Sequence, residues 1–233
     1  ARFHTTTEFC VVPRPGDLAR GLLGRLLGRL LGRLFGRRPL GRLPPRRSHP
    51  NGLLFRCGFQ CWHFLFAIFF GSDDGNTESV SHRIARRLGE EAVDIYDVGE
   101  VKQLDFLNYD RLILGIPTWD FGQIQSDWEE FWEDVEEINF SGKTVAFVGL
   151  GDQFGYADFF LDAMGMLYEV VSKSADRIVG YWPTDGYDYI SSKAEITIDH
   201  SNEKKFVGLA LDEDQQPELS SQRLNIWCAE IHT

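Results

Sequence analysis

Three short polar segments each follow an apolar run, and their side chains are suited to binding a flat, phosphorylated ligand. The first, residues 71–77, reads Gly-Ser-Asp-Asp-Gly-Asn-Thr. Small residues let backbone N–H groups converge, and the start of a helix adds partial positive charge, so this segment suits a phosphate. It matches neither the P-loop pattern nor the Gly-x-Gly-x-x-Gly dinucleotide pattern. Taken alone, it also fits an ordinary strand-to-helix turn.

The other two segments each carry an aromatic ring. Residues 117–122 read Pro-Thr-Trp-Asp-Phe-Gly and residues 149–156 read Gly-Leu-Gly-Asp-Gln-Phe-Gly-Tyr, so Trp119 and Tyr156 lie just beyond apolar runs. Two rings that face each other across a crevice can enclose a flat ring, and each stacking contact is worth about 1 kcal/mol beyond area burial. The alternative is packing at the rim of the domain, which the polar, glycine-rich surroundings disfavour.

Alternating apolar runs and amphipathic stretches predict an α/β fold that brings these segments together. Apolar runs predict strands at residues 64–70, 93–98, 111–116 and 144–150, and a fifth that begins at 177–181 and continues, or gains a neighbour, at 206–211. Helices are expected at 76–88, 126–138, 157–173 and 221–231, with a poorly patterned one within 99–109. A Ser126-x-x-Glu129 capping box is expected to open the second. Ligands of parallel sheets bind beyond the carboxyl ends of the strands, where all three segments lie.

Charge divides the chain into two parts. Residues 1–63 hold twelve arginines, no lysine and two acidic residues, a net charge of +10, whereas residues 64–233 hold 12 basic and 33 acidic residues, a net charge of −21. We therefore expect a basic leader, residues 1–63, followed by one globular domain, residues 64–233. A domain at −21 argues against nucleic acid and anionic membranes as partners and favours basic proteins.

The leader has an unusual repeat. Glycines recur every fourth residue from Gly24 to Gly36, each followed by arginine, and four prolines follow between Pro39 and Pro50. Three interpretations stay open: an arginine-rich targeting segment, a basic helix on a membrane surface, or sequence that is not native to the protein. Cys57 and Cys61 near His63 form only a weak metal pattern. We expect the leader to be disordered or without a structural role.

Cysteine and hydropathy patterns bear on the compartment. Only Cys228 of the four cysteines lies in the domain, so no disulfide framework is expected and a reducing, cytoplasmic location is favoured. The longest apolar run, residues 64–70, is far shorter than the roughly 20 residues that a membrane helix needs.

Five stretches together carry a family resemblance: Phe-Phe-Gly-Ser and Gly-Asn-Thr-Glu within 69–78, Leu-Gly-Ile-Pro-Thr-Trp at 114–119, Ser-Gly-Lys at 141–143 leading into 149–153, Gly-Tyr-Trp-Pro-Thr at 180–184, and 206–212. In this order and at these spacings, residues 65–231 resemble flavodoxins of the long-chain bacterial type. The resemblance implies a flavodoxin-like three-layer sandwich, with a five-stranded parallel sheet in the order 2-1-3-4-5, helices on both faces, and an insertion in the last strand at residues 182–205.

The resemblance also implies a ligand and a role. The expected protein is a monomeric, low-potential, one-electron carrier with non-covalent FMN. The phosphate would be held by Ser72, Asp73, Asp74, Gly75, Asn76 and Thr77. Trp119 and Tyr156 would enclose the isoalloxazine, and its edge and the ribityl chain would meet Pro117, Thr118, Asp120, Phe121, Gly122, Gly151, Asp152 and Gln153. The Asp120–Phe121 peptide would lie beside flavin N5. The expected partners are redox proteins, such as a flavodoxin–NADP reductase, that dock on an acidic face.

Asp74 departs from the family pattern, in which this position is usually Thr. Unit charges about 7 Å apart repel by roughly 2 kcal/mol at an effective dielectric constant of 20. A carboxylate beside a phosphate is therefore expected to weaken FMN binding, unless it turns outward or is protonated.

Three other function classes compete with the carrier. A receiver-type signalling domain would need an acceptor Asp after the third strand and a Lys after the fifth, where this chain has Ile116-Pro117-Thr118 and Tyr181-Trp182-Pro183. An FMN-dependent quinone reductase would need a nicotinamide site, and the sequence shows no dinucleotide motif. A flavin-free, partner-binding descendant remains open because of Asp74. The sequence shows no His-Glu-x-x-His and no His–Ser or His–Cys site motif.

Overall fold

The computed structural model describes residues 66–198 and 202–232. The leader, the first two residues of the predicted strand at 64–70, and the candidate metal residues Cys57, Cys61 and His63 lie outside the described residues. Everything below concerns residues 66–198 and 202–232, which belong to one compact unit, Phe59–Thr233.

A parallel sheet forms the centre of the domain. Its main strands are β2 (Val93–Asp97), β1 (Phe66–Phe70), β3 (Arg111–Trp119) and β5 (Thr144–Leu150), hydrogen-bonded in that order. Both β6 (Arg177–Val179) and β10 (Leu209–Leu211) pair with β5 in parallel, so together they make the fifth position. The predicted order 2-1-3-4-5 is confirmed. The first strand is buried at every residue, as expected for a parallel strand covered on both faces.

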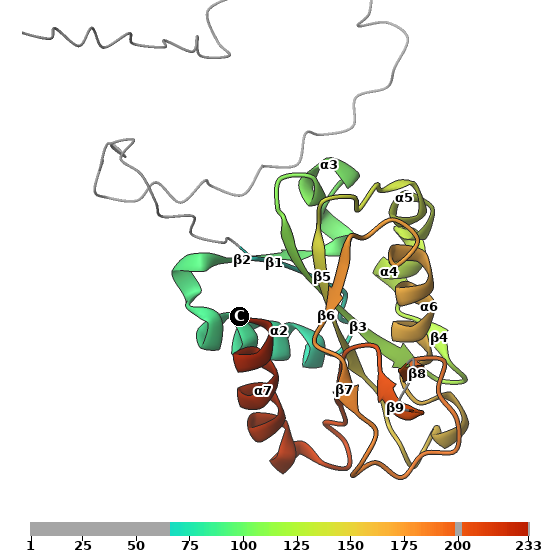
Figure 1. Ribbon diagram of the computed structural model, residues 1–233. Coiled ribbons are helices and arrows are strands. Elements are labelled where there is room, and N and C mark those ends of the chain that lie inside the picture. Colours follow the sequence, from blue (N-terminus) through green and yellow to red (C-terminus); the bar gives the residue numbers. More distant parts are fainter. Residues whose placement is uncertain (1–65, 199–201, 233) are drawn as a thin grey trace, which may run out of the picture. The chain divides into compact units, whose positions relative to one another are not determined.

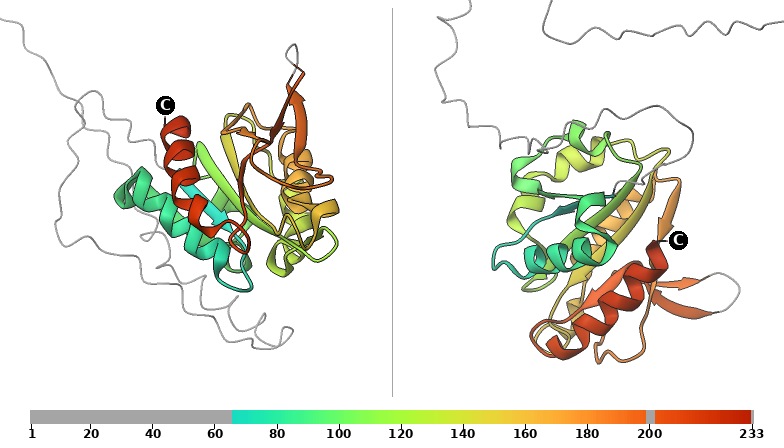
Figure 2. Two further views of the ribbon diagram at one scale, coloured as in Figure 1. Left: turned by 90° about the horizontal axis from the view of Figure 1, so that it is seen from below. Right: turned by 90° about the vertical axis from the view of Figure 1, so that its left-hand side faces the viewer.

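Helices cover both faces of the sheet (Figures 1 and 2). On one face, α2 (Asn76–Leu88) and α7 (Pro217–Ile231) pack against each other. On the other lie α4 (Ser126–Glu130), α5 (Trp132–Glu137) and α6 (Asp162–Val171). The spacing of Val80, Ile84 and Leu88 predicts α2 at the bounds that it has, and all three are buried. The short α3 (Gln103–Phe106) lies in the poorly patterned crossover.

Three helix predictions are wrong in detail. The helix expected at 126–138 is interrupted at Phe131 and forms two helices, α4 and α5. The residue that caps α4 is Gln125 and not Ser126: the Gln125 side chain accepts a hydrogen bond from the Trp128 N–H. The helix expected from 157 begins with a 3₁₀ turn at Ala157–Phe159, and α6 starts only at Asp162 because Leu161 adopts a left-handed conformation with φ of 61°. The closing helix begins at Pro217, four residues earlier than expected.

The predicted insertion forms a small antiparallel sheet of its own. Strand β9 (Glu203–Phe206) pairs with β7 (Trp182–Pro183) on one side and β8 (Glu195–Ile198) on the other. A Cβ added at Gly165 of α6 would lie 2.3 Å from the Lys193 carbonyl carbon, so the insertion backbone sits directly on this helix. Phe206 pairs with Trp182 of β7 and Glu195 of β8, so it belongs to the insertion sheet. Only Leu209–Leu211 of the predicted 206–211 stretch joins the main sheet.

No helix within 66–198 or 202–232 is long and apolar enough to cross a membrane.

Candidate functional site

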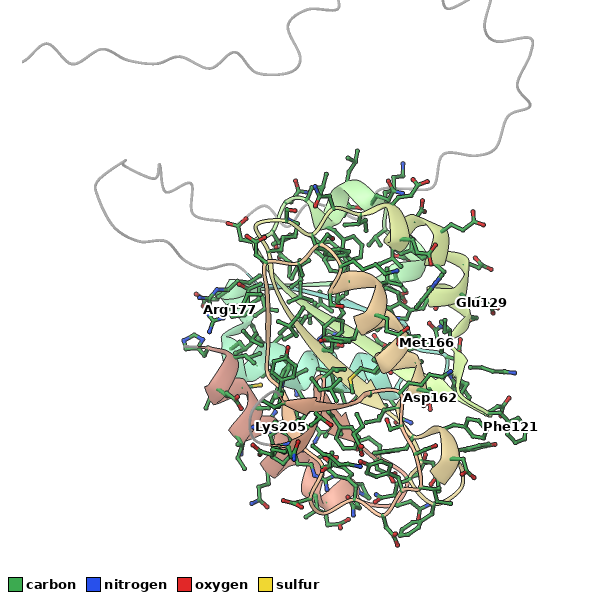
Figure 3. All side chains as sticks on the ribbon, turned by 45° about the vertical axis from the view of Figure 1, so that its right-hand side comes forward. Phe121, Glu129, Asp162, Met166, Arg177 and Lys205 are labelled. Carbon is green, nitrogen blue, oxygen red and sulfur yellow. The ribbon has the colours of Figure 1, made fainter. Side chains whose placement is uncertain are left out.

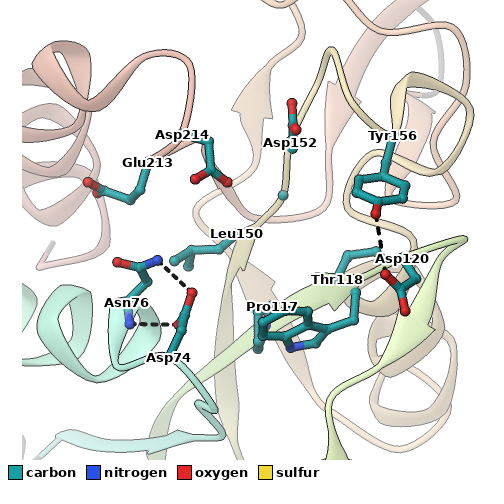
Figure 4. Close-up of a pocket in the computed structure, with 12 residues that line it drawn as sticks. Asp74, Asn76, Pro117, Thr118, Asp120, Leu150, Asp152, Tyr156, Glu213 and Asp214 are labelled. Carbon is teal, nitrogen blue, oxygen red and sulfur yellow. Dashed lines mark hydrogen bonds between the residues drawn. The ribbon is translucent and has the colours of Figure 1, made fainter.

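A pocket opens at the carboxyl ends of β1, β3 and β5, and the three segments singled out above all contribute to it (Figure 4). Nine of the predicted site residues line it: Asp74, Asn76, Pro117, Thr118, Trp119, Asp120, Gly151, Asp152 and Tyr156. Three lining residues were not predicted: Leu150, Glu213 and Asp214. The position follows the rule for ligand sites of parallel sheets.

The first segment forms a tight turn between β1 and α2. Gly75 adopts a φ of 84°, which favours glycine, and its N–H donates to the Ser72 hydroxyl over 3.0 Å. The helix begins immediately afterwards, at Asn76. Backbone N–H groups in the first turn of a helix have no partner within the helix, so the start of α2 carries partial positive charge at the pocket.

Asp74 fills part of this space. Its carboxylate accepts one hydrogen bond from the Asn76 N–H, over 2.9 Å, and another from the Asn76 side-chain amide, over 2.7 Å (Figure 4). The side chain thus caps the start of α2 and remains exposed where it lines the pocket.

Asp73 connects the first segment to the start of α4. Its carboxylate accepts hydrogen bonds from the Gln125 side-chain amide, over 3.0 Å, and from the Ser126 hydroxyl, over 2.8 Å. It therefore ties the first segment to the start of α4 and does not line the pocket. Gln125 also fits against Gly71, where an added Cβ would lie 2.0 Å from its side-chain oxygen. Sequence reasoning missed Gln125, because its contact with Asp73 spans 52 residues.

Thr77 lies in the first turn of α2 and is fully buried, yet its hydroxyl has no hydrogen-bond partner. A buried hydroxyl without a partner costs free energy. In the described part of the domain only three other buried side-chain atoms share this state, and one is the indole nitrogen of Trp119, which lines the pocket.

The second segment is a tight turn between β3 and β4 (Gln123–Ile124). Asp120 adopts a φ of 43° and Gly122 a φ of 85°. A Cβ at Gly122 would lie 2.9 Å from an oxygen of Asp162. Phe121 is 73% exposed and projects from the surface (Figure 3). Phe121 and Gly122 therefore lie beside the pocket without lining it, while Thr118 accepts a hydrogen bond from the Ala163 N–H.

The third segment turns around Asp152, whose carboxylate accepts hydrogen bonds from the Phe154 and Gly155 N–H groups. Tyr156 follows and donates its hydroxyl to Asp120 over 3.3 Å (Figure 4). The negative charge of Asp120 disfavours the phenolate and raises the pKa of Tyr156, with a smaller contribution from the hydrogen bond.

Gln153 points away from the pocket. It is fully buried, and its backbone and side-chain N–H groups donate to the same Asp212 oxygen, over 3.1 and 2.8 Å. Its side-chain oxygen accepts the Asp188 N–H over 2.7 Å. This residue links the third segment to the insertion and to the segment after β10, so it positions the pocket wall.

Acidic residues dominate the pocket. Asp74, Asp120, Asp152, Glu213 and Asp214 line it, and the lining includes no Lys or Arg. Burial and the charges of its neighbours, Asp212 foremost, raise the pKa of Asp214. The sequence showed 212–214 only as an acidic run, without its distance from the pocket. Within the described residues no cluster of His, Cys, Asp or Glu is suited to a metal.

This architecture defines a protein of the flavodoxin-like class, and three comparisons agree. The flavodoxin family model matches residues 68–227. The chain is 47% identical over 165 residues to a flavodoxin of Picosynechococcus, and this alignment covers 70% of this chain and 94% of that protein. It is 46% identical over 167 residues to flavodoxin 1 of Escherichia coli, and this alignment covers 72% of this chain and 92% of that protein. The crystal structure of Fusobacterium nucleatum flavodoxin bound to flavin mononucleotide aligns with a TM-score of 0.64 at 33% identity, covering 72% of this chain and 96% of that one.

The chain belongs to the flavodoxin family. Members of this family transfer electrons to redox partners and are not enzymes, which confirms the expected class.

Proposed function

We propose that the pocket holds FMN, with its phosphate at the start of α2 and its ring between Trp119 and Tyr156. The observation that carries the proposal is that one pocket is lined by Asn76, the first residue of α2, and by both aromatic residues. The flavodoxin of Fusobacterium that this domain resembles was solved with the same ligand.

The residues present fit such a ligand. The buried Thr77 hydroxyl and the Trp119 indole N–H both lack partners, and a ligand with phosphate, hydroxyl and carbonyl oxygens offers hydrogen-bond partners to both. Gly75, whose surroundings are open and whose φ is positive, lets the turn present its backbone to a phosphate.

FMN, when bound, supplies the capacity to take up and release single electrons. The chain binds and orients it. Five carboxylates around the pocket raise the free energy of any negative charge added there, and the effect is strongest where water is excluded. These side chains therefore favour a low reduction potential, at about 59 mV for each 1.4 kcal/mol and one electron.

Removing either ring tests the site. We expect the purified full chain to show the absorption bands of oxidised flavin, and Trp119→Ala and Tyr156→Ala to weaken FMN binding by about tenfold or more each, because each removes a stacking contact. Phe154→Ala is the control, since Phe154 is 57% exposed in the same segment but does not line the pocket. Fluorescence titration of the apo-protein measures the dissociation constants. A chain that binds no FMN contradicts the proposal.

For partner docking, we propose an electrostatic contact on the acidic rim. Glu213 and Asp214, from the acidic run at 212–214, line the pocket, and the run at 127–137 adds exposed carboxylates on α4 and α5. Phe121 and Phe154 add exposed apolar surface. A basic redox protein, such as a flavodoxin–NADP reductase, complements this surface.

Ionic strength tests the docking. We expect the rate of electron transfer from such a reductase to fall as salt is added, because screening weakens attraction between exposed charges. Asp214→Asn should slow the reaction at low salt. Asp176→Asn should leave it unchanged, because Asp176 is exposed just before β6, at the amino ends of the strands and away from the pocket. An electron-transfer rate that does not change with salt concentration would show that docking is not electrostatic.

A further inference from the structure

The anion site at the start of α2 already has an occupant from the chain itself. Both carboxylate oxygens of Asp74 are engaged: one accepts the backbone N–H of Asn76 and the other its side-chain amide. The helix is 13 residues long, so its amino terminus carries the partial positive charge that favours anions. The Asp74 carboxylate has the charge sign and the hydrogen-bond acceptors that a phosphate would bring to these donors.

Asp74 leaves other donors unused. The Thr77 hydroxyl, one residue further along the helix, is buried and has no partner. This hydroxyl therefore remains available to an acceptor that a ligand at the start of α2 would bring.

No positive side chain offsets the competition. The residues that line the pocket include five carboxylates and neither Lys nor Arg. Arg83, which contacts the lining residue Glu213, is already paired with its carboxylate over 2.8 Å. A phosphate that enters must therefore displace Asp74 from the Asn76 donors or lie beside its charge, whereas a flavin without a phosphate does neither.

We propose that Asp74 is a specificity-determining residue that substitutes for the phosphate of the ligand and lowers the preference of this chain for FMN over riboflavin. The inference rests on the proposed FMN site. The ring contacts at Trp119 and Tyr156 are the same for both flavins, so Asp74 acts only on the difference between them.

The test is a pair of titrations with the full-length apo-protein, one with FMN and one with riboflavin, followed by quenching of flavin fluorescence. Asp74→Asn keeps the size and hydrogen bonding of the side chain but removes its charge, and Asp74→Ala removes the occupant. We expect both variants to bind FMN at least about tenfold more tightly than the unchanged chain and to bind riboflavin within about twofold of it.

Two controls separate occupancy from general acidity. Asp214→Asn removes a carboxylate that lines the same pocket but has no hydrogen bond to Asn76 among those observed, and Glu136→Gln removes an exposed charge on α5. If Asp214→Asn raises the FMN-to-riboflavin ratio as much as Asp74→Asn does, the specific role of Asp74 is overturned.

The outcomes also separate this inference from the proposal beneath it. Binding of both flavins with a ratio that Asp74→Asn and Asp74→Ala leave unchanged overturns the role of Asp74 and leaves the FMN site standing. Failure of every variant to bind either flavin overturns both. As a second measurement, inorganic phosphate should shift the amide resonance of residue 76 in Asp74→Ala at lower concentrations than in the unchanged chain, and equal concentrations would contradict the proposal.

Discussion

Asp120 combines two unusual properties at one residue of the pocket. Its backbone lies in the left-handed region, with a φ of 43°. Apart from glycine, Asp is one of the residues that adopt this region most readily. Its carboxylate accepts a hydrogen bond from the hydroxyl of Tyr156, and its negative charge holds the pKa of that phenol above its usual value. The turn that positions Trp119 and the ring opposite it are therefore coupled through one side chain.

Neutralising Asp120 should release this effect. In Asp120→Asn the backbone conformation is retained, because Asn also tolerates positive φ, but the charge that opposes the phenolate is lost. We expect the pKa of Tyr156 to fall toward the ordinary value for Tyr, so that the phenolate forms at lower pH. Ultraviolet difference titration against a Tyr156→Phe background measures this. An unchanged or higher Tyr156 pKa would show that Asp120 is not the cause of the shift.

At the scale of elements, the wall of the pocket depends on a buried link between three segments. Gln153 joins Asp212, which follows β10, and the backbone of Asp188, which lies in the insertion. Asp212 is fully buried and also accepts the N–H groups of Asp214 and Gln215. The insertion therefore helps to hold the Tyr156 segment in place.

Breaking this link should cost stability. Gln153→Leu keeps much of the volume but leaves the Asp212 carboxylate and the Asp188 N–H without their side-chain partner, and we expect the free energy of unfolding to fall by about 2–3 kcal/mol. Urea denaturation measures it. Gln123→Ala, at an exposed position of β4, should change it by less than about 0.5 kcal/mol. Similar losses in the two variants would contradict the role of Gln153.

The elements that the sequence predicts well are those decided by local pattern. Helix α2 is bounded by two glycines with positive φ and buries residues at regular spacing, and β5 is an apolar run whose bounds were predicted as they are. The placement of Gln125 and the inward turn of Gln153 depend on side chains from distant segments, Asp73 and Asp212. For the same reason Glu213 and Asp214 lay outside the predicted site: only the pairing of β10 with β5 brings them there.

At the scale of the whole chain, the two parts differ in charge and in composition. The family model matches only residues 68–227, and the curated relatives described above cover 70–72% of this chain. The sheet, both helical layers and all three pocket segments lie within residues 66–232.

We therefore expect residues 64–233 to act as an autonomous domain. A chain reduced to these residues should fold and bind FMN with the affinity of the full chain, within about twofold, because every residue that lines the pocket is retained. Circular dichroism and flavin titration of the two chains make the comparison. Loss of FMN affinity on removal of residues 1–63 would show that the leader contributes to the site.

The five-residue strand β1 separates the start of the described domain, at Phe66, from the end of the sheet where the pocket lies. Its carboxyl end leads into the turn at residues 71–77, while Phe66 begins it at the amino ends of the strands, beside Arg111 of β3. At about 3.3 Å per residue, the strand holds these ends roughly 15 Å apart. Because Phe66 lies at the end of β1 opposite the pocket, we expect fusion partners or affinity tags attached before it to leave the shape of the pocket unchanged.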